Sequence, residues 1–344
     1  MGESAWARIE DRPIRVALIG YGLAGSAFHA PLIEATPGLD LVAIMTSREV
    51  PPGVRRVASA NELEALGVDL VVVATPNDSH VPLARDALRA GAHVVVDKPI
   101  AVTADQADEL IRAAAEAERL LTVFQNRRWD GDYLTLRDLI ADERLGRVHR
   151  FESRFERWRP IAADAWRESD DLARGGGLLL DLGTHLVDQA VGLFGDVESV
   201  YAEIAAVRPG ALVEDDVFLA LRHVGGTTSH LWMSAVAAEP GLRMRALGTG
   251  GAWSSDSLDS QEGSLRAGRR PDDDGFGENP PGRLNGEPYP TRAGDYLSFY
   301  RGVEQALHRG GPNPVPPSEA ATVLRILEAA RLAASTRSVI TLAG

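Results

Sequence analysis

Asp181 and His185 stand at a spacing that suits proton transfer. They lie four positions apart in the run Gly175 to Asp188, which reads G-G-G-L-L-L-D-L-G-T-H-L-V-D. If this run forms a helix after a glycine turn, the two side chains lie on one face, one turn apart. A carboxylate beside an imidazole orients the ring and supports its protonated form, which makes a general acid or base near neutral pH. A capped surface pair and a two-ligand metal site fit the same spacing, which does not separate the three.

Three glycines near the N-terminus have the G-x-G-x-x-G spacing of a dinucleotide-binding turn. They are Gly20, Gly22 and Gly25, with Leu23 and Ala24 between them, in the run R-V-A-L-I-G-Y-G-L-A-G. The first suits a tight turn, the second lets the backbone approach a pyrophosphate, and the third lets the next helix pack on the strand. The anion would bind at that helix's N-terminus, where N–H groups and the helix dipole favour negative charge. In a chain with 34 glycines, a chance match is the alternative.

A further candidate is Lys98, which follows the apolar run Ala92 to Val96 within Asp97-Lys98-Pro99. We predict a buried parallel strand for this run, and ligands of open α/β sheets bind beyond the carboxyl ends of such strands. A lysine held there beside a nicotinamide can donate to, or take a proton from, a substrate hydroxyl. The alternative is a solvated surface charge.

The elements that must position these residues alternate between strand and helix as far as Phe124. Such alternation predicts a parallel, doubly wound sheet of the Rossmann type. Pro31 should end or kink the first helix near its last turn, and Thr103 with Gln106 forms a capping-box pattern. After the apolar run that precedes Gly20, the predicted strands are 39–45, 68–74, 92–96 and 120–124, and the predicted helices are 23–35, one that ends at 90, and one from 103 to 119.

The residues after the strand 39–45 bear on the choice of cofactor. They are Thr46, Ser47 and Arg48. A small hydroxyl followed by arginine favours NADP over NAD, because arginine accommodates a ribose 2′-phosphate. Glu49 opposes this interpretation, and a solvated loop charge at Arg48 is the alternative.

Thr75, Pro76 and Asn77 follow the strand 68–74 and therefore reach the same ligand edge of the sheet. With His80 they are predicted cofactor contacts. Taken singly, Thr-Pro-Asn is more typical of a plain turn, and His80 of a surface histidine.

The alternation stops at the polar, basic cluster Asn126-Arg127-Arg128-Trp129, where we place a domain boundary. Residues 1–127 form the predicted dinucleotide-binding domain, and residues 128–344 form an α+β domain with an open, mostly antiparallel sheet. A closing amphipathic helix, 318–334, can pack back on the first domain. The other predicted elements are a helix at 133–139, strands at 148–158, 199–207, 217–223, 227–234 and 243–248, and a long loop at 260–292.

Composition narrows the classes of function. The chain has 344 residues, enough for two domains, and a net charge of −13 that disfavours nucleic acid or an anionic membrane as partner. The absence of cysteine excludes disulfides, thiolate nucleophiles and zinc sites built on cysteine. No apolar run approaches the ~18 residues of a membrane span, and the N-terminus has no hydrophobic segment. We expect a cytoplasmic protein that binds no metal.

Taken together, these motifs resemble the glucose-fructose oxidoreductase and inositol dehydrogenase family, Gfo/Idh/MocA. The resemblance rests on G-Y-G-L-A-G near the start, A-T-P-N-D-S-H at 74–80, D-K-P at 97–99 and the run at 175–188. The stretches F-H-A-P-L-I, F-Q-N-R-R-W-D-G-D and W-R-E are most similar to the branch that contains NADP-dependent scyllo-inositol dehydrogenases.

The resemblance implies a role for each residue at the site. Lys98 would contact substrate and nicotinamide, and its bond to Pro99 would be cis, with Asp97 in place of the usual glutamate. His185 would be the acid/base residue and Asp181 its carboxylate partner, both touching substrate hydroxyls. The resemblance also implies that Trp166 and Arg167 reach the cofactor and that Asn126 lies near the substrate. Thr184 stands where close relatives often carry proline.

The implied reaction is hydride transfer between a nicotinamide and a hydroxyl-bearing carbon of a sugar or cyclic polyol, with NADP preferred over NAD. Two alternatives remain open: a glycosidase that works by oxidation and elimination, and a non-enzymatic, nucleotide-dependent sensor. The family also implies that the open sheet is buried in a homodimer or homotetramer, although such a sheet can equally face solvent.

Overall fold

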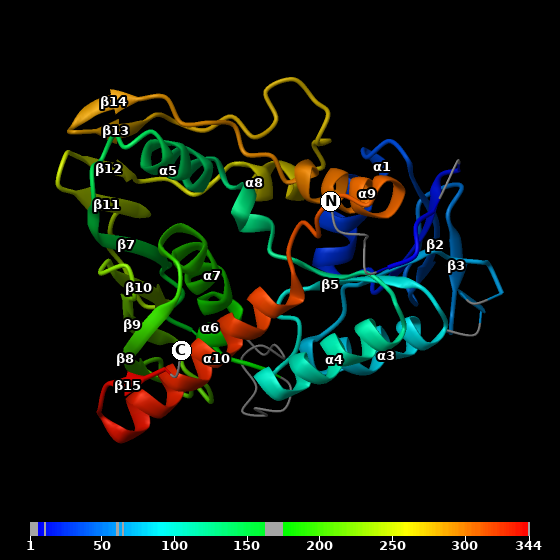
Figure 1. Ribbon diagram of the computed structural model, residues 1–344, viewed down its shortest axis with the longest axis horizontal. Helices are drawn as coiled ribbons and strands as arrows, with labels where there is room; N and C mark the ends of the chain where they lie inside the picture. The colour runs from blue at the N-terminus through cyan, green and yellow to red at the C-terminus, as the bar shows by residue number, and fades with distance from the viewer. Residues whose placement is uncertain (1–5, 10–11, 60–61, 64, 162–174, 343–344) are drawn as a thin grey trace. The chain divides into compact units, whose positions relative to one another are not determined.

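The computed structural model describes residues 6–9, 12–59, 62–63, 65–161 and 175–342 (Figure 1). The chain divides into two compact units, each made of three stretches. The first unit comprises residues 1–129, 260–277 and 295–321, and the second comprises residues 130–259, 278–294 and 322–344. A single boundary after residue 127 was predicted, whereas both units include stretches from the C-terminal third of the chain.

The first unit contains a six-stranded parallel sheet, which confirms the predicted Rossmann architecture. Its central strand β4 is an unbroken run of Leu and Val, and the neighbouring β1 and β5 are also mostly aliphatic and buried, as parallel strands are when helices cover both faces. In the order β3-β2-β1-β4-β5-β6, the strands are β3 Arg55–Val57, β2 Leu39–Met45, β1 Ile14–Ile19, β4 Leu70–Val73, β5 His93–Asp97 and β6 Leu121–Phe124.

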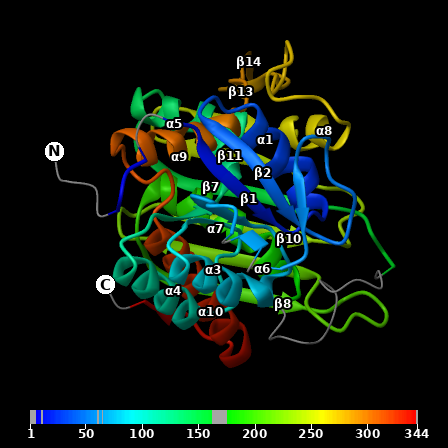
Figure 2. The ribbon, with the colours of Figure 1, turned by 90° about the vertical axis from the view of Figure 1, so that its right-hand side faces the viewer.

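Helices cover both faces of this sheet. On one face lie α3 His80–Arg89 and α4 Ala104–Glu116, and on the other lie α1 Ala30–Glu34 and α9 Leu297–Arg309 (Figures 1 and 2). The predicted capping box is present at the start of α4, where Thr103 accepts the amide of Gln106.

The helix after the glycine turn changes its winding near Pro31. A π-helical segment, η1 Ala24–His29, runs directly into α1, which continues past Pro31 to Glu34. Proline has no N–H to give to the preceding turn, so a change of winding just before it avoids a lost hydrogen bond. Pro31 therefore does not end the helix.

The second unit contains a nine-stranded sheet in the order β14-β13-β12-β11-β7-β10-β9-β8-β15. Among its described strands, β7 and β10 pair in parallel and the other neighbours pair antiparallel, which agrees with the predicted sheet. The strands are β7 Val148–Glu156, β8 Val197–Ala205, β9 Asp216–His223, β10 Thr228–Ser234, β11 Met244–Gly248, β12 Ala252–Ser255, β13 Gly282–Leu284, β14 Glu287–Tyr289 and β15 Ile340–Thr341.

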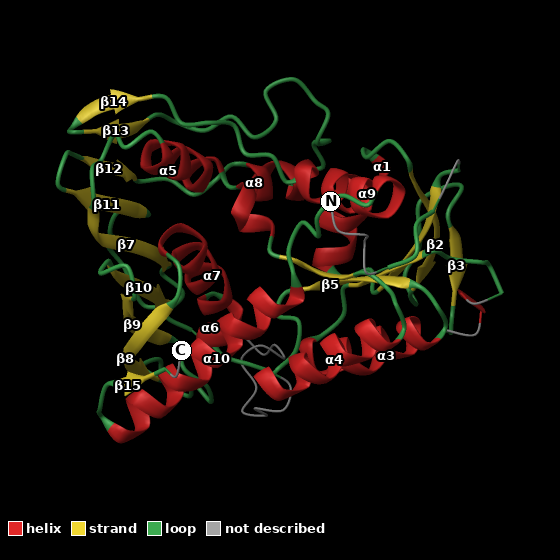
Figure 3. Cartoon of the chain, viewed as in Figure 1, coloured by secondary structure: helices red, strands yellow, loops and turns green. Residues whose placement is uncertain are grey.

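One face of this sheet packs on helices. These are α5 Gly131–Ala141, α6 Leu178–Asp181 and α7 Gly183–Phe194 (Figure 3). Along β9 and β10 buried side chains alternate with half-exposed ones, because successive residues of a strand point to opposite faces. Among the described elements, no helix covers the half-exposed face.

The predicted long loop at 260–292 is partly wrong. It contains α8 Gln261–Arg266 and the hairpin strands β13 and β14. The closing helix is α10 Pro317–Thr336, slightly longer than predicted. No helix of the described residues is long and apolar enough to cross a membrane.

Candidate functional site

The carboxyl ends of four neighbouring strands lie side by side in the first unit. Ile19 pairs in register with Met45 on one side and Val73 on the other, and Val73 pairs with Val96. The predicted site segments follow these strand ends and therefore share one edge of the sheet: the glycine turn, residues 46–48, residues 75–77 and Lys98.

The glycine turn has the shape that a dinucleotide needs. Gly20 has φ +95°, and a Cβ there would clash with the carbonyl of Ala74, the residue that follows β4. A Cβ at Gly25 would clash with the carbonyl of Gly20, whereas a Cβ at Gly22 would meet nothing within 4 Å. The first and third glycines are thus needed for packing, and the second leaves open backbone for a pyrophosphate. The residues present fit NAD(P).

Exposed arginines surround the end of β2. Ser47 and Arg48 are exposed, and Thr46 holds the loop by accepting the amide of Arg48 at 3.1 Å. The neighbouring strand β3 adds Arg55 and Arg56, both exposed and paired with the last half of β2. These two arginines were not predicted as site residues, because the pairing of β3 with β2 brings them to this position.

His80 is not a surface histidine. Its side chain is buried, Nδ1 lies 2.7 Å from the carbonyl oxygen of Pro99, and Nε2 lies 2.9 Å from that of Thr75. Burial lowers the pKa of His80, although the charge of Asp97 acts in the opposite direction. The ring therefore connects the turn after β4 to the turn that carries Lys98, and its contact with a cofactor stays a prediction.

The segment between Thr75 and His80 forms a short 3-10 turn, η2 Asn77–Ser79. Ser79 donates to the hydroxyl of Thr75 at 2.7 Å, Pro76 is exposed, and Asn77 is buried. These residues stand at the ligand edge, as predicted from the strand before them.

Lys98 follows β5 and is half-buried. Its main-chain N–H donates to Asp97 Oδ1 at 2.8 Å, and the Lys98–Pro99 peptide bond is cis, as the resemblance implies. Of the 36 lysines and arginines in the chain, only Lys98 is a lysine. An arginine stays protonated throughout the physiological range, whereas a lysine amine is compact and can exchange a proton. That Lys98 is the only lysine is visible in the sequence and would have strengthened its prediction as a site residue.

Asn126 and the basic cluster behind it belong to the first unit. Asn126 is buried and begins η3 Asn126–Trp129, with one residue between it and the end of β6. Arg127 and Arg128 form ion pairs with Glu262 at 2.6 Å and Glu319 at 2.5 Å. The two arginines therefore serve the packing of this unit, and a substrate contact by Asn126 stays a prediction.

Asp181 and His185 lie in the second unit and not in one continuous helix. The helix is interrupted at Leu182, so Asp181 ends α6 while His185 lies in the first turn of α7. The amide of His185 donates to the carbonyl of Leu182 at 3.1 Å instead of that of Asp181. A glycine at 183 weakens a helix at this point and lets it approach the side chain of Leu327.

The imidazole of His185 is buried against an aromatic ring. It is 6% exposed, and its ring centroid lies 6.2 Å from that of Phe155 in an edge-to-face arrangement. The surface-pair alternative is therefore wrong for His185. Among the described residues there is no group of three side chains suited to hold a metal ion.

Gly177 holds the start of α6 in place. It has φ +94° and ψ 156°, a region that glycine alone occupies readily, and its carbonyl accepts the amide of Asp181 at 3.2 Å. The Glu214 carboxylate lies next to Gly177 and accepts hydrogen bonds from Arg331 at 2.8 and 3.4 Å. The main-chain carbonyl of Glu214 accepts the amide of Leu178. The position of Asp181 thus depends on a distant residue of α10.

Two predicted residues, Trp166 and Arg167, lie outside the described residues. Lys98 belongs to the first unit, whereas Asp181 and His185 belong to the second, so their joint action at one substrate stays a prediction. Within the first unit the structure brings together the glycine turn, Arg48, Thr75 and Lys98 at one sheet edge.

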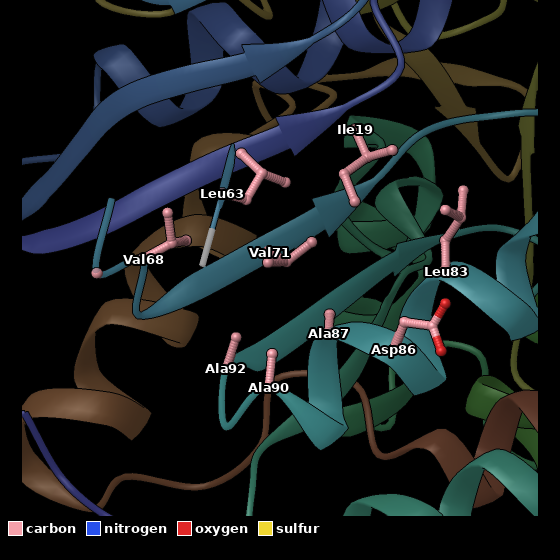
Figure 4. A pocket seen from close by; sticks show the side chains of 10 residues that line it. Ile19, Leu63, Val68, Val71, Leu83, Asp86, Ala87, Ala90 and Ala92 are labelled. Carbon is pink, nitrogen blue, oxygen red and sulfur yellow. The ribbon is translucent and has the colours of Figure 1, made fainter. Parts of the chain in front are cut away.

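An apolar cavity elsewhere in the first unit does not match this chemistry. It lies between β4 and α3 and is lined by aliphatic side chains such as Leu63, Val71 and Leu83 (Figure 4). Asp86 is the one charged side chain among its described lining residues. A pyrophosphate needs donors, which this lining does not offer.

Known protein families match the sequences of both the Rossmann domain and the second domain. Residues 14–125 match the family described as "Oxidoreductase family, NAD-binding Rossmann fold", and residues 133–254 match the "GFO/IDH/MocA C-terminal domain". The chain is 41% identical to the uncharacterized oxidoreductase YdgJ of Escherichia coli, over 96% of this chain and 99% of that protein. This chain belongs to the Gfo/Idh/MocA family.

Two further relatives extend the comparison of this Gfo/Idh/MocA protein. The scyllo-inositol 2-dehydrogenase (NADP(+)) IolW of Bacillus subtilis is 36% identical, over 92% of each chain. The solved structure of the putative oxidoreductase YvaA from Bacillus subtilis superposes with a TM-score of 0.92 at 33% identity, over 98% of this chain and 100% of that one. The chain is therefore an NAD(P)-binding oxidoreductase of this family, and these likenesses do not assign it to a branch.

Proposed function

We propose that this protein transfers a hydride between a nicotinamide and a hydroxyl-bearing carbon of a sugar or cyclic polyol. The observation that carries the proposal is Lys98, the only lysine of the chain, at the sheet edge that begins with the glycine turn. The relatives support it, since IolW is named as a scyllo-inositol dehydrogenase. An inositol-like polyol is accordingly the first substrate to test.

Each residue has a part in the proposed reaction. When bound, the cofactor supplies the nicotinamide carbon that accepts or gives the hydride. His185 takes the hydroxyl proton or returns it, and Asp181 orients the imidazole. The ammonium group of Lys98 stabilises negative charge that develops on the substrate oxygen. Asn126 contributes to holding the substrate, and Trp166 and Arg167 to holding the cofactor.

NADP is the proposed cofactor. Arg48 is exposed just beyond β2, where the ribose of a dinucleotide binds in this fold, and Arg55 with Arg56 adds positive charge on the adjacent strand. A 2′-phosphate is a dianion that gains from such a cluster, whereas a free ribose hydroxyl prefers a carboxylate acceptor.

We also propose that the protein is a homodimer or homotetramer through the half-exposed face of the nine-stranded sheet. Aromatic rings form a continuous row there: Phe218 lies 5.0 Å from Trp232 and 6.4 Å from Tyr201 between ring centroids. The guanidinium of Arg154 lies 3.8 Å above the Trp232 ring. Large aromatic side chains and arginine are enriched at protein interfaces, which favours a second copy as the occupant.

The experiment is a screen of inositols, aldoses and their keto forms with NADP and NAD in parallel. We expect turnover with at least one polyol pair and a higher kcat/KM with NADP. Lys98→Met and His185→Ala should bind NADP as the wild type does while kcat falls sharply. Release of sugar without net reduction of cofactor would instead indicate the glycosidase alternative, and binding without any turnover would indicate a sensor.

A further inference from the structure

A buried network of polar side chains lies behind the turn that carries Lys98. The hydroxyl of Tyr300 is 2.6 Å from His29 Nδ1, and His29 Nε2 is 3.9 Å from Asp97 Oδ2. Asp97 Oδ1 in turn accepts the main-chain N–H of Lys98 at 2.8 Å. The side chains of His29 and Tyr300 are fully buried. We call these three side chains the Tyr300–His29–Asp97 network.

The members of the network come from three elements of the first unit. His29 ends η1, the helical segment that begins at the glycine turn, and Asp97 ends β5. Tyr300 belongs to α9, some 200 positions further along the chain. Phe124 packs against the His29 ring with the centroids 4.4 Å apart, which closes the network from the side of β6.

Donors and acceptors in the network follow one direction. Burial and the charge of Asp97 raise the pKa of Tyr300 well above its usual value, so the phenol keeps its proton and can donate a hydrogen bond to Nδ1 of a neutral His29 ring. When Nδ1 accepts that bond, the one N–H of the neutral ring is at Nε2, which faces Asp97. Burial by itself raises the pKa of Asp97, but the neighbouring His29 and the charge of Lys98 lower it below its usual value. The Asp97 carboxylate therefore stays ionised and can accept the Lys98 amide.

We propose that His29 and Tyr300 are positioning residues that hold the Asp97 carboxylate where it accepts the Lys98 amide, and thereby fix the position of Lys98. The distance from His29 to Asp97 is too long for a hydrogen bond, so an N–H dipole facing a carboxylate provides the attraction. This inference rests on the proposed function for the role of Lys98. The competing interpretation is that the network only ties α9 to η1.

The single lysine allows a test without turnover. Protein labelled with ¹⁵N-lysine gives one lysine amide cross-peak in an NMR spectrum, that of Lys98. We expect this peak to move in Tyr300→Phe and in His29→Leu towards its position in Asp97→Ala, which has no carboxylate acceptor. A peak that keeps its wild-type position in both variants would refute the proposal.

Thr122→Val is the matched control. Thr122 is fully buried in β6 and its hydroxyl donates to the carbonyl of Val315 at 3.0 Å, so the variant also loses one buried hydroxyl bond of the first unit. It has no part in the network, and we expect its Lys98 peak and kcat to match the wild type. An equal movement of the peak in this control would show that general loosening, and not the network, is responsible.

Kinetics complete the test. In Tyr300→Phe and His29→Leu we expect kcat to fall about tenfold or more, since small displacements of a catalytic group are costly, with the Kd for NADP within about twofold of wild type. The double variant should be little worse than either single one, because the residues act as one unit. A moved peak with unchanged kcat would overturn the positioning role. Wild-type protein without turnover would contradict the proposed function, while the Lys98 peak still decides the network.

Discussion

Replacing Gly177 by alanine tests how the start of α6 is held. The backbone at Gly177 lies in a region that other residues enter at a cost of about 1–3 kcal/mol. In addition, the new Cβ would lie 2.5 Å from the carboxyl carbon of Glu214, which must then move away from Arg331. Arg331 is 40% exposed, so the weakened ion pair adds only about 1 kcal/mol. We expect a total loss of about 2–4 kcal/mol.

Gly195→Ala is the control for this experiment. Gly195 has φ +77° and ψ −160°, close to the same region, but a Cβ there would meet nothing within 4 Å. It should therefore show only the backbone cost. Urea unfolding followed by tryptophan fluorescence measures both variants and also Gly177→Ala in a Glu214→Ala background, in which the clash is gone.

The comparison has a clear outcome. In the Glu214→Ala background, the cost of Gly177→Ala should fall to that of Gly195→Ala. Because the carbonyl of Gly177 accepts the amide of Asp181, the single variant should also lower kcat. If Gly177→Ala costs no more than Gly195→Ala, Glu214 does not restrain this turn and the reasoning is wrong.

Three further predictions concern the cofactor, pH and assembly. Arg48→Ala should raise the Kd for NADP about tenfold or more, because one charge-assisted hydrogen bond to the 2′-phosphate is lost, and should leave the Kd for NAD nearly unchanged. An equal effect on both Kd values would show that Arg48 does not bind the 2′-phosphate. Burial and the charge of Arg119 lower the pKa of His93 to about 4, below the usual 6.5. The buried neutral ring of His93 therefore contributes fully to stability above pH 6.5, and this contribution is lost as the pH falls towards 4. The free energy of unfolding should fall by about 2 kcal/mol between pH 7 and pH 5. Urea unfolding of His93→Asn, which keeps an acceptor for the amide of Leu120, should lack this loss. Trp232→Glu should dissociate the oligomer in light scattering, whereas Val224→Glu, at a 71% exposed position, should not.

Local patterns predicted the first unit well. The glycine turn, the capping box at Thr103 and the β-branched strands each depend on neighbouring residues, so spacing was enough to find them. The edge that carries Lys98 followed from the rule that parallel strands present their carboxyl ends together.

Long-range contacts explain what the sequence did not reveal. The contact between His29 and Tyr300 joins helices some 270 positions apart, and Glu214 reaches Gly177 only through the fold. The break at Leu182 was not predicted because apolar residues continue on both sides of it, and the close approach of Gly183 to Leu327 arises only in the fold. The short strands β13 and β14 lie in a segment rich in glycine and proline, whose composition is typical of a loop.

The central claim, hydride transfer to a sugar or polyol carbon, is tested most directly with NADPH deuterated at C4 of the nicotinamide. The protein is incubated with a panel of keto-inositols and keto-sugars, and the products are examined by mass spectrometry. The wild type should place deuterium on the carbon that gains the hydroxyl. Lys98→Met and His185→Ala should bind NADPH as well as the wild type but transfer deuterium at least about 100-fold more slowly. Wild-type protein that binds NADPH but transfers no deuterium to any member of the panel, or variants that transfer it at the wild-type rate, would contradict the claim.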